Sequence, residues 1–189
     1  MAESDTVLDF WLTTVGAARW YKADPALDAE VAARFEGMVA EARRGAFSDW
    51  ILNPRSGLAL ILLLDQFPRH IWRDTAAAFE SDARAMAKAK RAMSLGHDMK
   101  IAEPERQFFY LPLMHSESQA DQDRCVRLIL TRMPLTGAAN LPHAVAHRDV
   151  IRRFGRFPYR NAALGRDTTE AEQAWLDAGG YRAAELALA

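Results

Sequence analysis

The chain has 189 residues, a formal net charge of −1 and 50% hydrophobic residues, which suits one globular domain over residues 1–189. The near-zero charge gives no general attraction to nucleic acids or to anionic membranes, and the single cysteine, Cys125, excludes an intrachain disulfide. No apolar run approaches the ~20 residues of a membrane-spanning helix, and residues 1–9 lack the basic and apolar regions of a signal peptide. We therefore expect a cytoplasmic protein with no membrane partner.

Helical periodicity and capping residues predict an all-α fold of seven to eight helices joined by short turns. The expected helices run from about residue 7 to 12, 25 to 44, 54 to 64, 75 to 95, 104 to 111, 117 to 133, 142 to 154 and 169 to 178. The apolar run over residues 58–64 is leucine-rich and has no second strand to pair with, so we predict a buried helix. Ser116 is the expected N-cap of the sixth helix, and Pro142 is expected to open the seventh.

The first polar motif directly follows this apolar run and contains Asp65 and Arg69. The carboxylate and the guanidinium are expected at the edge of the core, where a charge must be paired because it is costly to desolvate. The pattern is open to two interpretations, an internal ion pair that locks the helix end and a binding site.

Glu117 and Asp121 form the second candidate pair. They are four residues apart in a predicted helix and share a face that continues to Cys125, so we expect both carboxylates to point inward. Inward carboxylates can exchange protons, or they can bind a cation or an amine. They can equally pair with Arg69 and Arg106 in a structural network.

His143 and His147 are also four residues apart, a spacing that can chelate a metal ion. A third ligand would have to come from His115, Glu117 or Asp121. His147 shares its helix face with apolar residues, which favours a buried core histidine. The sequence has no phosphate-binding loop, dinucleotide fingerprint or nucleophile elbow, and we expect neither a metal nor another cofactor.

Residues 152–161 interleave arginine with aromatic side chains, and Arg156, Arg160 and Asn161 are the candidates within this segment. Such a pattern can contact phosphates and stack bases, but the segment is short and the whole chain is not basic. An anion site for a small acidic metabolite fits the segment as well as RNA does, and we expect no nucleic-acid partner for the chain. A structural loop that Phe154 and Phe157 pin to the core fits the segment best.

Together these segments resemble the bacterial family catalogued as domain of unknown function 924. The matching stretches are VLDFW from Val7, LLLDQFPR from Leu62, Glu105-Arg106, YLP from Tyr110, HSE from His115, Asp121-Gln122, His147 and FGRFPYRN from Phe154. They span nearly the whole chain in order. After Arg69 the family usually has asparagine, whereas this chain has His70. The resemblance implies a tetratricopeptide-like array of antiparallel helix pairs and carries no established reaction.

Three hypotheses follow, and we favour a domain that binds a small anionic ligand or an acidic peptide at an arginine- and carboxylate-lined pocket. The residues expected at this pocket are Asp65, Arg69, Arg106, His115, Glu117, Asp121, Gln122, His147, Arg156, Arg160 and Asn161. The first alternative is a hydrolase or lyase with Glu117 or Asp121 as base and His147 as its partner. The second is a scaffold protein whose polar motifs only lock the fold. The sequence also leaves open a homodimer formed through an exposed helix.

Overall fold

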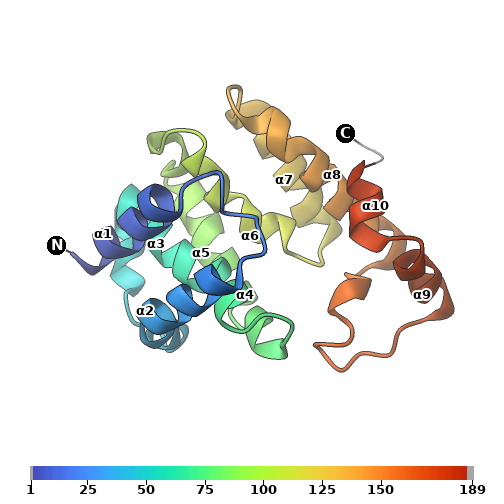
Figure 1. Cartoon of the computed structure of the whole chain (residues 1–189). Coiled ribbons are helices and arrows are strands. Elements are labelled where there is room, and N and C mark those ends of the chain that lie inside the picture. The colour runs from blue at the N-terminus through green and yellow to red at the C-terminus, as the bar shows by residue number, and fades with distance from the viewer. Residues whose placement is uncertain (1, 187–189) are drawn as a thin grey trace. The chain divides into compact units, whose positions relative to one another are not determined.

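The computed structural model describes residues 2–186, which form helices and the turns between them (Figure 1). No strand occurs in this range, so the all-α prediction is confirmed. The chain forms two compact units, of which the first ends at Pro112 and the second starts at Leu113. Each unit is described by itself below. The single domain and the tetratricopeptide-like pairing of helices stay predictions.

The first unit contains both α-helices and shorter helical turns. Its α-helices are α1 (Glu3–Leu8), α2 (Pro25–Arg43), α3 (Pro54–Asp65), α4 (Phe67–Ile71), α5 (Asp82–Ser94) and the start of α6 (Leu111–Met114). A π-helix, η1 (Asp9–Val15), continues directly from α1. The 3-10 helices are η2 (Ser48–Leu52), η3 (Ala76–Phe79), η4 (Asp98–Lys100) and η5 (Glu105–Phe109).

Two helices of the first unit start where the sequence predicts, at residues 25 and 54. The Asp24 side chain accepts hydrogen bonds from the N–H groups at the start of α2, and the Asn53 side chain accepts one at the start of α3. Pro25 and Pro54 follow at the first helical position, where the missing N–H would have had no intrahelical partner. These two predicted helix starts are confirmed.

The core of the first unit is built around α3. All residues from 58 to 64 are at most 1% exposed, and the helix packs against α1, α2 and α5. Beside it, the Phe67 ring lies 4.9 Å from the ring centroid of Phe35 and 5.4 Å from that of Trp11. Burial of so many apolar groups is the main stabilising contribution to the unit, and it confirms the buried helix.

The second unit contains α7 (Gln119–Arg132), α8 (Gly137–Phe154), α9 (Glu170–Asp177) and α10 (Gly180–Leu186), with the 3-10 helix η6 (Pro158–Arg160). Helices α7 and α8 lie side by side, and α10 packs against α8 (Figure 1). Gly137 permits the tight turn between α7 and α8, since a Cβ there would come within 3.0 Å of the Ile129 carbonyl oxygen. Helix α8 ends at Gly155, whose φ of 70° suits glycine.

The residues between α8 and α9, 155 to 169, form a segment that we call the arginine loop. Phe157 is fully buried and packs in a core cluster with Val150 and Ile151, while Phe154 and Trp175 cover the edge of this cluster. The aromatic side chains therefore anchor the arginine loop to α8 and α9, as the structural interpretation of the sequence anticipated.

Several predicted helix boundaries are wrong. Helix α5 starts at Asp82 rather than at residue 75, because residues 76–79 form a separate 3-10 turn. Pro142 lies inside α8, which starts five residues earlier at Gly137. No helix in the described part of the chain is long and apolar enough to cross a membrane.

Candidate functional site

Glu117 lies in the turn before α7, so the prediction that it shares a helix face with Asp121 is wrong. The physical reason is the hydroxyl of Ser116. It accepts a hydrogen bond from the Ser118 N–H at 3.2 Å and donates one to the Asp121 carboxylate at 3.0 Å. These bonds stabilise a turn, and α7 begins at Gln119 after the cap at Ser118.

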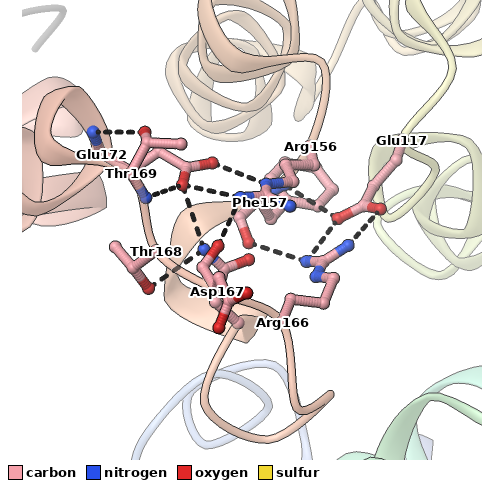
Figure 2. Close-up of polar contacts among 9 residues, drawn as sticks. Glu117, Arg156, Phe157, Arg166, Asp167, Thr168, Thr169 and Glu172 are labelled. Carbon is pink, nitrogen blue, oxygen red and sulfur yellow. Dashed lines mark hydrogen bonds and ion pairs between the residues drawn. The ribbon is translucent and has the colours of Figure 1, made fainter.

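The Glu117 carboxylate is bound by the arginine loop. It accepts hydrogen bonds from Arg166 Nη1 at 2.8 Å, Arg166 Nη2 at 3.0 Å and the Phe157 N–H at 2.8 Å (Figure 2). Burial acts to raise the pKa of Glu117, but the bonds from Arg166 and Phe157 outweigh it and hold the pKa below its usual value. Glu117 is therefore ionised at neutral pH.

A second carboxylate, that of Glu172, is bound by Arg156. Arg156 Nε lies 2.6 Å from Oε1 and Nη2 lies 2.8 Å from Oε2 (Figure 2). Glu172 is only 3% exposed and also accepts the Thr169 N–H at 2.8 Å, which completes a capping box at the start of α9. The hydrogen bond from Arg156, followed by that from Thr169, lowers the pKa of Glu172 to about 2.

Asn161 and Arg160 complete the polar part of the arginine loop. Asn161 is buried, and its amide nitrogen lies 3.3 Å from both Glu172 Oε2 and Thr168 Oγ1. The Arg160 guanidinium lies 4.4 Å from the centroid of the Phe157 ring, an arrangement that allows a cation–π interaction. Arg160 is 5% exposed, and its charge contributes to the low pKa of Glu117.

His147 lies among aromatic side chains of the same unit. Its ring centroid is 4.6 Å from that of Tyr181, 5.4 Å from that of Phe157 and 6.4 Å from that of His115. Nδ1 lies 2.8 Å from the His143 carbonyl oxygen, and because a carbonyl only accepts, Nδ1 carries the proton. Desolvation is the main cause that lowers the pKa of His147, to about 3, so the ring is neutral at pH 7.

The two histidines of the predicted chelating pair use their Nδ1 atoms in other contacts. His147 Nδ1 bonds the backbone as described, and His143 Nδ1 lies 3.0 Å from the Tyr181 hydroxyl. Within residues 2–186, no group of three or more His, Cys, Asp or Glu side chains has the geometry to hold a metal ion.

Gln122 holds the turn that carries Glu117. Its side chain is fully buried, and its amide nitrogen donates to the carbonyl oxygens of Leu113 at 3.3 Å, Met114 at 2.6 Å and Ser116 at 2.7 Å. The predicted residue Gln122 therefore acts on the site by positioning the backbone next to Glu117.

Three predicted site residues, Asp65, Arg69 and Arg106, belong to the first unit. Arg69 donates from Nη2 to both oxygens of Asp82, at 2.7 and 2.9 Å. Asp65 is buried at the end of α3 and accepts a hydrogen bond from the Gln66 amide. Arg106 donates from Nε to the Ile101 carbonyl at 3.0 Å. The structure thus gives each of them a partner within its own unit.

Sequence reasoning missed Arg166, Glu172 and Tyr181. Arg166 lies five residues beyond the segment 152–161, in which arginine alternates with aromatic side chains, and no aromatic residue stands beside it. The spacing of Thr169 and Glu172 is that of a capping box and could have identified Glu172. Tyr181 follows Gly179 and Gly180, beyond the expected end of the last helix at residue 178. No motif in the neighbouring sequence indicates its contact with the histidines.

The comparisons with known proteins give one family match and one similar solved structure. The family model described as "Bacterial protein of unknown function (DUF924)" matches residues 7–180. A solved structure of a protein of unknown function from Agrobacterium tumefaciens is 41% identical, with a TM-score of 0.87 over 93% of this chain and 97% of that chain. No curated protein matches the chain. Because the family model covers nearly the whole sequence, the chain belongs to the bacterial DUF924 family.

Proposed function

We propose that this chain binds a small anionic ligand or an acidic peptide, and that the arginine loop of the second unit provides the binding groups. The observation that carries the proposal is the way the loop binds Glu117, with two guanidinium N–H groups and one backbone N–H around a single carboxylate. A planar guanidinium matches a carboxylate with two parallel hydrogen bonds, which makes arginine the residue of choice for recognising this group.

The surroundings of the loop support the same chemistry. Arg166 and Arg156 are partly exposed, at 23% and 28% of their side-chain surfaces, so a ligand in solution can reach them. Arg160 adds positive charge close to Glu117, and its position over Phe157 limits its motion. A preorganised set of donors loses less conformational entropy when an anion binds than a mobile set does.

A thermal-shift experiment tests the proposal. The purified protein is titrated with glutarate, inorganic phosphate and tri-glutamate, each compared with sodium chloride at the same ionic strength. A ligand at about 100 times its Kd stabilises by about 2.7 kcal/mol, which corresponds to a rise of roughly 5–11 °C in Tm for a chain of this size.

The matched variants are Arg166→Gln, which removes a guanidinium of the loop, and Arg152→Gln, which removes a 61% exposed guanidinium of α8. We expect the rise in Tm to disappear in the first variant and to persist in the second. An equal rise in both variants, or a rise that sodium chloride reproduces, would contradict anion binding at the loop. A flat response to every anion would favour the scaffold hypothesis.

The enzyme hypothesis receives less support from the geometry. A general base works best when its pKa lies near the working pH, whereas Glu117 is ion-paired with a lowered pKa and His147 has a pKa of about 3. Both groups therefore have little tendency to take up a proton at neutral pH. Binding without turnover is the function that these contacts favour.

A further inference from the structure

We infer that Arg166 and the Phe157 N–H form a carboxylate-binding cradle that Glu117 occupies as an internal substitute, and that an external carboxylate binds there by displacing Glu117. The inference rests on the proposed function. The shared chemistry is a carboxylate, from either a small organic acid or an acidic peptide.

The donors of the cradle are held by contacts that do not involve Glu117. Arg166 Nη2 also donates to the Phe157 carbonyl at 3.1 Å, and the Arg166 N–H donates to the Asn161 carbonyl at 2.9 Å. The Phe157 ring is fully buried in the core, which fixes its backbone N–H. The cradle therefore keeps its shape when the carboxylate of Glu117 leaves.

Glu117 itself is placed so that it can leave. It lies in the irregular turn before α7, and 30% of its side-chain surface is exposed. Glu172 shows the contrast, because it is 3% exposed and is part of a capping box within α9. Rotation of the Glu117 side chain into solvent needs no helix to unwind, whereas removal of Glu172 would uncap α9.

The cradle also has a donor that Glu117 does not use. Arg166 Nε is buried and has no acceptor within the described part of the chain. An unsatisfied buried donor is costly, so natural proteins usually provide a partner. A ligand that carries a second oxygen-bearing group besides its carboxylate, as glutarate or an acidic peptide does, can supply one.

The test is chemical rescue in the full chain. Glu117→Ala removes the atoms beyond Cβ, and acetate has the size and charge of the lost group. With ionic strength held constant, we expect acetate to restore at least about half of the Tm lost in Glu117→Ala, in a saturable manner, while neutral acetamide restores none. Glu117→Ala/Arg166→Gln is expected to lose the rescue. Asp149→Ala, which removes a 47% exposed carboxylate from α8, is the control without a cradle.

Binding affinity then tests the displacement. If Glu117 competes with the ligand, its removal raises the fraction of open cradle, and glutarate or tri-glutamate should bind Glu117→Ala at least about tenfold more tightly than wild type. Glu117→Gln, which removes the charge and keeps the side chain, serves as the second variant if the alanine variant is poorly folded. Tighter binding of glutarate alone identifies a small acid, and tighter binding of tri-glutamate alone identifies a peptide.

Three outcomes would overturn the inference. The absence of acetate rescue in a folded Glu117→Ala protein shows that there is no cradle. Equal affinity of wild type and variant for the acids refutes the displacement and leaves the proposed function standing. If acetate rescues the variant but neither wild type nor variant binds glutarate or tri-glutamate, both the displacement and the proposed function are refuted. Glu117 is then a permanent structural partner of Arg166.

Discussion

Arg156 binds Glu172 with two hydrogen bonds, Nε to Oε1 at 2.6 Å and Nη2 to Oε2 at 2.8 Å, at the first turn of α9. The same carboxylate closes the capping box with Thr169. One side chain therefore joins the arginine loop to a helix start. This dual contact makes the ionisation of Glu172 important for the stability of the second unit.

The first prediction concerns acid. The folded-state pKa of Glu172 is about 2, below the value of about 4.3 expected in the unfolded chain. Because the folded pKa is the lower one, the stabilisation is complete above pH ~4.3 and is lost as the pH falls toward 2. Thermal unfolding followed from pH 6 to pH 2.5 should show a flatter profile for Glu172→Gln than for wild type. Identical profiles would show that Glu172 contributes nothing to acid sensitivity.

The second prediction concerns Gln122. Gln122→Ala removes the buried amide that donates to three backbone carbonyls, of which the Leu113 carbonyl still accepts the Ser116 N–H. We expect a loss of about 1–3 kcal/mol in the free energy of unfolding, measured by urea denaturation. The control is Gln119→Ala in the same helix, whose side chain bonds only the exposed Asp123, with an expected change within about 0.5 kcal/mol. A similar loss in both variants would argue against this role of Gln122.

The third prediction concerns the proton of His147. The ring nitrogens, observed by ¹⁵N NMR, should show a neutral ring with the proton on Nδ1 at pH 6, and titration should begin only well below the usual histidine range. As the pH falls, His147 takes up a second ring proton in the unfolded chain before it does so in the folded protein, because its pKa is lower in the folded protein. The stabilisation from the neutral ring is therefore present above pH ~6.5 and decreases as the pH falls toward 3. A His147 titration midpoint near 6.5 would contradict the structure.

The fourth prediction compares two glycines. In Gly137→Ala the new Cβ would come within 3.0 Å of the Ile129 carbonyl oxygen and of Met133 Cβ, so we expect a loss of about 1–3 kcal/mol. In Gly37→Ala the Cβ meets nothing within 4 Å on α2, and the higher helix propensity of alanine should add about 0.5–1 kcal/mol. Urea denaturation measures both. Changes of the same sign would contradict the close packing at Gly137.

The all-α fold and its main helices were predictable because the evidence for them is local. Two helix starts are indicated by a capping residue followed by proline, Asp24-Pro25 and Asn53-Pro54. The leucine-rich run over residues 58–64 indicates a buried helix. The starts of α7 and α8 were not predictable in the same way. A serine hydroxyl can cap a helix or stabilise a turn, and Ser116 does the second because its hydroxyl donates a hydrogen bond to the Asp121 carboxylate.

The candidate site was predicted by residue type but not by pairing. The sequence indicated Glu117, Arg156 and the segment around Arg160 as candidates. It did not show that Arg166 binds Glu117 across 49 positions, because that contact depends on how the arginine loop returns to the turn before α7. The family resemblance, by contrast, was predictable from ordered motifs, and the family model over residues 7–180 confirms it.

The double use of Glu172 has a consequence for local unfolding. If α9 frays at its first turn, the capping box opens and Arg156 loses its partner, and if the arginine loop moves away, the cap of α9 is weakened. The two segments therefore open together as one cooperative unit. Hydrogen exchange at the amides of Arg156, Phe157 and Glu172 would then occur through a common opening event rather than by independent fluctuations of a loop and a helix end.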